Sequence, residues 1–152
     1  MEATSAFIHE PDPRNPGWHT WDLVEQDRFN PVVMGKMLVR REGDRSARLR
    51  LADTRTMHGN LHGNIHGGVT LSLIDIAMFA TVYGVIGEDV AGSVTLDLST
   101  QFVGAGRLGE PLDAVSEVMK ETRRLVFIRG TVEQGDTLVA TYMGTLRKPA
   151  SR

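Results

Sequence analysis

A long apolar segment with one charged residue inside it constrains this chain more than any other feature. Residues 69–86 are apolar apart from a few small polar side chains and Asp75, the only charged residue between His66 and Glu88. Such a segment is typical of a helix enclosed by other structure, and we predict a helix over residues 68–86, roughly 28 Å long. Asp75 at its centre and the lack of basic flanks argue against a membrane span. Because an ionised carboxylate is costly to bury without partners, we expect Asp75 to be functional.

A loop rich in glycine, histidine and asparagine leads into this helix. Its sequence over residues 58–68 is HGNLHGNIHGG, and its four glycines argue strongly against helical structure. The three histidines are four positions apart, a spacing that would align metal ligands on a helix, but the glycines disfavour that helix. We therefore expect no metal here. The loop and the carboxylate of Asp75 together indicate an active site.

The composition is that of an ordinary soluble domain. The 152 residues fit one domain with one core, 41% of them are apolar and 24% are charged. The net charge of -2 provides no basic field for nucleic acid or an anionic membrane. The absence of cysteine excludes thiol catalysis, disulfides and thiolate metal sites. The N-terminus has acids and prolines where a signal peptide would be basic and then apolar, so we expect a cytoplasmic protein.

Strands are predicted on both sides of the long helix. They cover residues 34–41, 46–51, 93–103, 111–119, 125–133 and 137–147. The first two are joined by the turn sequence EGDR and the last two by QGD. Residues 1–17 contain three prolines and little periodicity, which predicts an irregular arm, and residues 20–27 are expected to form a short helix.

This order of elements predicts an α+β fold. A hairpin, one long buried helix and a further set of strands suggest an antiparallel sheet wrapped around a single central helix. We divide the chain into an N-terminal arm with the short helix, residues 1–30, and one domain, residues 31–148. In the strand after the helix, alternation predicts two faces, one with Val94, Leu96, Leu98 and Phe102 and the other with Thr95, Asp97, Ser99 and Gln101.

The loop and the helix also match the pattern of a known family. The chain has the spacing N-x-x-G-x-x-H-G-G from Asn60 to Gly68, with Asp75 nine positions after His66. This spacing resembles the signature of hotdog-fold acyl-CoA thioesterases, in the PaaI-like branch of phenylacetyl-CoA and 4-hydroxybenzoyl-CoA thioesterases. Later segments look like strands of the same family, so that the resemblance covers residues 34–147. It implies the hotdog fold and a sheet that continues across a homodimer, with active sites at the subunit interface.

The resemblance implies a role for each of five residues. The backbone N–H of Gly67 would bind the thioester oxygen, since the start of a helix favours negative charge. Asp75 would act as general base on water or as a nucleophile. It lies about two turns beyond Gly67, so it would face Gly67 of the other subunit. Asn60 would orient the water or the carboxylate, His66 would brace the loop or contact the thioester, and Thr95 would lie near Asp75.

Each of these residues also has a structural interpretation. Gly67 is compatible with a tight turn alone, and Asp75 with capping a loop or pairing with an arginine. Asn60 is a common turn residue before glycine-rich chain. His66 is interpreted as structural rather than as a proton shuttle, and Thr95 fits an ordinary strand position.

Substrate-binding residues are expected around the same helix. Gly68 would let a substrate approach the backbone closely. The candidates for an apolar acyl pocket, each of which also fits a simple core position, are Met78, Phe79, Val82 and Tyr83. The candidates for the coenzyme A phosphates, each of which also fits a solvated surface position, are Arg123, Arg124, Arg107, Arg147 and Lys148.

The activity that the resemblance implies is hydrolysis of an acyl-CoA thioester to a free carboxylic acid and coenzyme A. No metal or redox cofactor is expected, because coenzyme A is part of the substrate. The expected assembly is a homodimer or a homotetramer, without nucleic acid or membrane as partners. Two alternatives stay open. One is a hotdog hydratase or dehydratase with His66 and Asp75 aimed at the substrate's α and β carbons, and the other is a non-catalytic hotdog protein that binds acyl-CoA.

Overall fold

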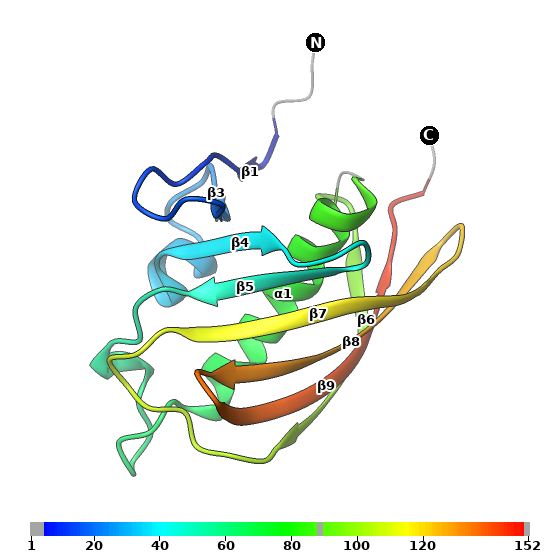
Figure 1. Cartoon of the computed structure of the whole chain (residues 1–152). Helices are drawn as coiled ribbons and strands as arrows, with labels where there is room; N and C mark the ends of the chain where they lie inside the picture. Colours follow the sequence, from blue (N-terminus) through cyan, green and yellow to red (C-terminus); the bar gives the residue numbers. More distant parts are fainter. Residues whose placement is uncertain (1–4, 88–89, 151–152) are drawn as a thin grey trace.

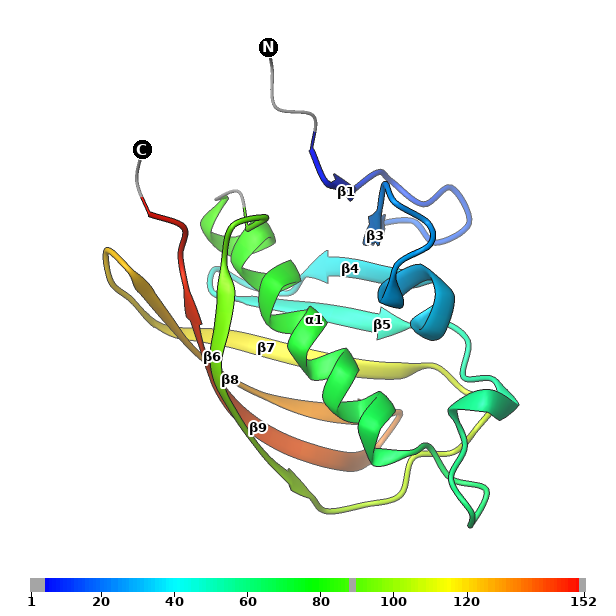
Figure 2. The same ribbon diagram turned by 180° about the vertical axis from the view of Figure 1, so that it is seen from behind.

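A strongly curved antiparallel sheet wraps around one long helix, α1 (Figure 1 and Figure 2). The computed structural model describes residues 5–87 and 90–150. Its main sheet has seven strands in the order β2-β4-β5-β7-β8-β9-β6, and all neighbouring strands are antiparallel. This architecture confirms the predicted α+β hotdog fold.

The elements have the following bounds. The main sheet contains β2 (His19–Thr20), β4 (Met37–Arg41), β5 (Ser46–Leu51), β6 (Val94–Phe102), β7 (Leu112–Glu121), β8 (Leu125–Gln134) and β9 (Thr137–Arg147). A small ribbon pairs β1 (Phe7–Ile8) with β3 (Asp22–Leu23). The helices are the π-helix η1 (Asn30–Met34), the 3₁₀-helix η2 (Thr56–His58) and α1 (Gly67–Ile86).

The helix α1 begins and ends at recognisable signals. Its N-cap is His66, whose ring Nδ1 accepts a hydrogen bond from the N–H of Gly68 at 2.9 Å. It ends at Gly87, which has a left-handed φ of 75°. By length and composition α1 is able to span a membrane, but 56% of its most apolar window is buried inside the protein. It is therefore the core helix that the sequence predicts.

The predicted short helix over residues 20–27 is wrong. Thr20 lies in β2, and Asp22–Leu23 form β3. Trp21 between them is only 1% exposed and stacks on Phe7 with the ring centroids 4.7 Å apart. Burial of this indole against the rest of the protein overrides the weak helical pattern of the segment. The first helical turn in this region is instead η1, which follows later in the chain.

The N-terminal arm is also more ordered than its prolines predict. Asp12 forms an ion pair with Lys36 at 2.5 Å, and this contact lowers the pKa of Asp12 to about 2. Trp18 packs against two guanidinium groups, those of Arg40 at 4.5 Å and Arg50 at 4.6 Å from the ring centroid. These contacts fasten the arm to β4 and β5. Residues 1–4 of the predicted arm lie outside the described residues.

A β-bulge in β6 corrects the predicted faces of that strand. Thr95 pairs with Leu146 of β9, but Asp97 pairs with Thr145, so Leu96 is an extra residue with no partner of its own. The bulge shifts the alternation by one position. Thr95 therefore faces the helix together with Leu98, and the prediction that these two residues lie on opposite faces is wrong.

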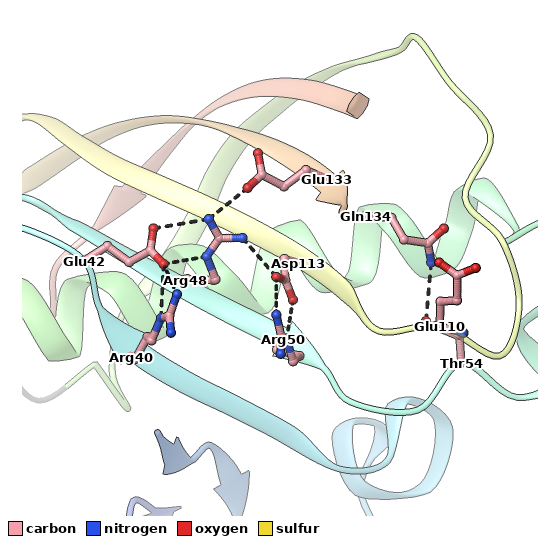
Figure 3. A network of polar contacts seen from close by, with 9 residues as sticks. All are labelled: Arg40, Glu42, Arg48, Arg50, Thr54, Glu110, Asp113, Glu133 and Gln134. Atoms are coloured by element: carbon pink, nitrogen blue, oxygen red, sulfur yellow. Dashed lines mark hydrogen bonds and ion pairs between the residues drawn. The ribbon is translucent and has the colours of Figure 1, made fainter. Parts of the chain in front are cut away.

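Charged side chains on the outer face of the sheet are bonded to one another (Figure 3). Arg48 makes ion pairs with Glu42, Asp113 and Glu133 at distances between 2.6 and 2.9 Å. Arg50 pairs with the same Asp113 at 2.8 Å, and these hydrogen bonds hold the pKa of Arg50 above its ordinary value. Because Asp113 is only 6% exposed, it needs both arginines as partners.

Candidate active site

The carboxylate of Asp75 lies at the open edge of the sheet. It is half-buried on α1 and accepts a hydrogen bond on Oδ1 from the hydroxyl of Thr95 at 2.7 Å. Its second oxygen, Oδ2, has no hydrogen-bond partner within residues 5–87 and 90–150. The bulge at Leu96 makes this contact possible, because it turns Thr95 toward the helix. The arrangement fixes one carboxylate oxygen and leaves the other available.

One backbone donor remains unused at the start of α1. The side chain of His66 satisfies the N–H of Gly68, and the carbonyl of His66 accepts the N–H groups of Val69 and Thr70 at 2.9 and 3.3 Å. The N–H of Gly67 is the first of the helix and has no acceptor in the described part of the chain. A donor at this position, reinforced by the helix dipole, suits an oxygen that gains negative charge.

A cavity of about 410 Å³ opens beside this donor. Its lining combines the loop before α1, the first turn of α1 and the chain after β6, with the residues Asn60, Asn64, Ile65, Gly67, Thr70, Phe102, Gly104, Ala105, Gly106 and Val139. The cavity is mainly apolar, with amide and hydroxyl groups near the helix start. It therefore has room for a small organic group next to the Gly67 N–H.

Asn60 and His66 hold the loop in place. The side-chain oxygen of Asn60 accepts the N–H groups of His62 at 2.9 Å and Asn64 at 3.1 Å, which is the turn geometry expected of asparagine. Its Nδ2 donor makes no hydrogen bond to the described residues. Because Nδ1 of His66 accepts the Gly68 N–H, the ring acts as the helix cap in this chain.

The histidine spacing does not produce a metal site in the described residues, where no three histidine, cysteine or acidic side chains gather. His58 is buried, with its Nδ1 accepting the N–H of Arg55 at 3.0 Å and its Nε2 2.7 Å from the carbonyl of Val33. Both ring nitrogens are therefore used by the fold.

The structure brings three of the predicted phosphate-binding arginines together. A cleft of about 410 Å³ is lined by the β7–β8 turn and the end of β9, including Arg123, Arg124 and Arg147. None of these three guanidinium groups has an ion-pair partner within the described chain. Arg147 pairs in register with Val94, which directly precedes Thr95 on β6, so the cleft lies beside the start of the strand that carries Thr95.

The other two basic candidates are paired. Arg107 forms a two-pronged contact with Glu110 at 2.8 and 2.9 Å. Lys148 also lines the cleft and pairs with Glu121.

The predicted acyl-pocket residues lie away from the cavity. Met78 is fully buried in the core, where its sulfur packs against Gly144. Tyr83 packs against His9 and Trp21 of the N-terminal arm, with ring centroids 5.1 and 5.3 Å away. Phe79 packs partly buried against the core. Val82 is also buried, and Gly68 is exposed beside His66.

Two lining residues of the cavity have no signal in the sequence. Phe102 reads as an ordinary strand residue, and Thr70 as a small polar residue of the core helix. Both reach the cavity through long-range folding, since β6 and the start of α1 are far apart in the sequence. The glycine and alanine of residues 104–106 give a weaker hint, because such a run often lets chain segments approach closely.

Comparisons with known proteins point to one family. The thioesterase superfamily model matches residues 62–141. A conserved protein from Pseudomonas aeruginosa is 30% identical with a TM-score of 0.58, over 68% of this chain and 80% of that chain. The phenylacetic acid degradation protein PaaI from Thermus thermophilus, solved as a mutant, is 26% identical with a TM-score of 0.61, over 74% of this chain and 92% of that chain.

A third structure carries a ligand. A hypothetical thioesterase from Streptococcus pneumoniae, solved with coenzyme A, is 21% identical with a TM-score of 0.65, over 76% of this chain and 90% of that chain. At this identity the likeness concerns the fold. No curated protein matches the sequence.

Proposed function

The chain belongs to the thioesterase superfamily, and from this membership we propose that it hydrolyses an acyl-CoA thioester to a free carboxylic acid and coenzyme A. The observation that carries the proposal is the hydrogen bond of 2.7 Å from Thr95 to Asp75, which orients the carboxylate and leaves Oδ2 available. A fixed carboxylate with one unused oxygen suits a base that takes a proton from water, or a nucleophile.

The proposed reaction needs two subunits. Gly67 and Asp75 are eight residues apart on α1, which at 1.5 Å per residue separates them by about 12 Å. One carbonyl group cannot contact both within a single chain. In a homodimer joined along the β6 edge, Asp75 of one subunit would face the Gly67 N–H of the other. The oligomeric state, dimer or tetramer, and the cytoplasmic location stay predictions.

The chemical steps follow from these positions. The Gly67 N–H donates to the thioester oxygen, Asp75 takes a proton from water, and the water oxygen attacks the carbonyl carbon. The negatively charged oxygen of the tetrahedral intermediate develops next to the N–H. The N–H binds this oxygen more strongly than the neutral carbonyl oxygen of the thioester. The C–S bond then breaks, and the coenzyme A sulfur leaves with a proton. Alternatively, the carboxylate attacks the carbon directly and water releases the acid afterwards.

Three arginines with no ion-pair partner among the described residues support coenzyme A as the leaving group. Arg123, Arg124 and Arg147 line one cleft at the end of β9, where guanidinium groups would bind the phosphates of coenzyme A. The thiol arm would then lead from this cleft to the Asp75 carboxylate. The acyl group would enter the cavity beside the partner's Gly67.

A thiol-release assay with short, long and aromatic acyl-CoAs tests the activity. We expect release of free coenzyme A by the wild-type protein and its loss in Asp75→Ala. Consumption of crotonyl-CoA without thiol release would indicate a hydratase instead. Tight acyl-CoA binding with no turnover of any substrate would indicate a carrier.

The Gly67 donor can be tested by a substitution that removes only the N–H. Proline is well accepted at the first helical position, and His66 before it has a φ of -64° and a ψ of 138°, which the residue before proline favours. We expect Gly67→Pro to lower kcat about 100-fold or more. Gly67→Ala keeps the N–H and is the matched control, since its Cβ would lie in ordinary contact, 3.4 Å from the Phe102 ring.

The shared site can be tested by mixing these variants. In a dimer of one Asp75→Ala subunit and one Gly67→Pro subunit, one site would combine the intact Asp75 with the intact Gly67. Co-expressed, differently tagged subunits should therefore regain up to half of the wild-type activity. If each subunit worked alone, the mixed dimer would stay inactive.

A further inference from the structure

Phe102 lies directly against the Gly67 backbone. It is the last residue of β6 and is 54% exposed. Two of its ring carbons, Cε1 and Cζ, are 3.4 Å from the point where a Cβ on Gly67 would lie. The ring therefore packs against the residue whose N–H has no acceptor in the described chain.

The same ring forms one wall of the cavity beside Gly67. The other two large apolar residues of the lining, Ile65 and Val139, are buried in the core at 6% and 2% exposure. The neighbouring segment cannot grow into the space, because a side chain on Gly104 would overlap the carbonyl of Leu138. Phe102 is therefore the large lining side chain that is not held on all sides by the core.

We propose that Phe102 is a specificity-determining residue, whose ring sets the width available to the acyl group at the carbon next to the thioester carbonyl. This inference rests on the proposed function, because it takes the Gly67 N–H as the binding partner of the carbonyl oxygen. With the carbonyl oxygen at that N–H, the next carbon of the acyl group lies beside the Phe102 ring. A branch at this carbon is wider than a methylene group and meets the ring.

Two substrates of equal composition measure this width. Butyryl-CoA and isobutyryl-CoA contain the same atoms and differ only in the branch next to the carbonyl. In Phe102→Ala, we expect the kcat/KM ratio of isobutyryl-CoA to butyryl-CoA to rise about 10-fold, the scale of one methyl group in an apolar pocket. Phe102→Trp should lower the same ratio. Phe102→Leu, the smaller change, provides an intermediate ratio and a variant with less risk to folding.

Phe29→Ala is the matched control. Phe29 is the same residue type, is 53% exposed and lies before η1, outside the cavity lining. Its removal should leave the ratio unchanged. Equal ratios in wild type, Phe102→Ala and Phe102→Trp, with all three proteins folded by circular dichroism, would overturn the inference.

Binding of non-hydrolysable thioether analogues separates this inference from the proposed function. The butyryl and isobutyryl analogues should show the same Phe102-dependent preference in calorimetric Kd values. If the wild type releases no thiol but the variants still change the Kd ratio, hydrolysis is refuted and the role of Phe102 stands. If thiol release occurs and neither ratio responds to Phe102, the role of Phe102 is refuted and hydrolysis stands.

Discussion

The two edges of the main sheet are built in opposite ways. The β2–β4 edge is covered by the N-terminal arm, where Trp18 is held by Arg40 and Arg50. The β6 edge is uncovered in the single chain and exposes apolar residues, including Leu96 at 51% and Phe102 at 54%. An exposed edge with apolar side chains is suited to pairing with another chain.

The same contrast holds for the charged groups. On the outer face of the sheet, next to the covered edge, Arg48 and Arg50 of β5 are bonded to Asp113 of the central strand β7 (Figure 3). At the open edge, among the described residues, the Asp75 carboxylate has one hydrogen-bond partner, Thr95, and the Arg147 side chain has none. Under the proposed function, the charges bonded to one another on the outer face would serve stability, and those at the open edge would serve binding and reaction. Substitutions at the two edges should therefore have separate effects.

The largest effect is expected at the open edge. Asp75→Asn keeps the shape of the side chain but removes the base, and should lower kcat about 1000-fold. The free energy of unfolding, measured with urea, should change by less than about 1 kcal/mol, because the half-buried carboxylate has no ion pair among the described residues. A large loss of stability would indicate instead that Asp75 has a structural role.

The charged network on the outer face should affect stability rather than activity. Asp113→Ala removes the shared partner of Arg48 and Arg50, and should lower the free energy of unfolding by about 3 kcal/mol. At a temperature where the variant is folded, kcat/KM should equal that of the wild type. A drop in kcat/KM of the folded variant would contradict the separation between the outer-face network and the open edge.

A smaller effect is expected in the basic cleft. Arg147→Gln removes one phosphate partner and should raise the KM for acyl-CoA about 10-fold with kcat unchanged. The wild-type KM should also rise with salt, and this dependence should weaken in the variant. Arg129→Gln is the control, because Arg129 already pairs with Glu117 on the outer face at 3.1 Å. Equal KM values for both variants would contradict a phosphate role.

The ion pair between Asp12 of the N-terminal arm and Lys36 should contribute to stability in a way that depends on pH below about 4. The Lys36 contact lowers the pKa of Asp12 from 3.8 to about 2. A lowered folded pKa stabilises the protein fully above pH 3.8, and this stabilisation is lost as the pH falls toward 2. The free energy of unfolding, measured with urea, should therefore be higher for the wild type than for Asp12→Asn at pH 6. The difference between the two proteins should shrink at pH 2. If the difference in the free energy of unfolding did not depend on pH, the effect of Asp12 would come from packing rather than from its charge.

The smallest effect is expected at Thr100 on β6. Its hydroxyl oxygen is buried without a hydrogen-bond partner in the described structure. Replacing such a group by an apolar one of similar shape is nearly neutral or stabilising, so Thr100→Val should raise the free energy of unfolding by up to about 1 kcal/mol. Destabilisation that grows on dilution would instead reveal a partner from a second subunit.

Local patterns predicted the regular elements well. The apolar run with one charge predicted α1, and alternation with glycine turns predicted β5 and β9 with their observed bounds. The spacing of Gly67 and Asp75 along the helix was also readable, because helix geometry converts sequence separation directly into distance. These features depend on neighbours in the sequence.

Features that depend on residues far apart in the chain could not be predicted from the sequence. The segment around Trp21 looked helical, but packing against Phe7 makes it extended. The acyl-pocket candidates Met78 and Tyr83 are occupied by the core and by the arm. Phe102 meets Gly67 only because β6 returns alongside α1 (Figure 2), and no local pattern encodes that approach.

The bulge at Leu96 limits which insertions and deletions β6 can accept. Thr95 and Phe102 are seven positions apart, an odd separation that strict alternation would place on opposite sides of the sheet. The additional residue turns both toward α1, one to the carboxylate and the other to Gly67. Deleting a single codon there would send one of the two side chains to the far side, so β6 tolerates exchange of residues at this point but not a change in their number.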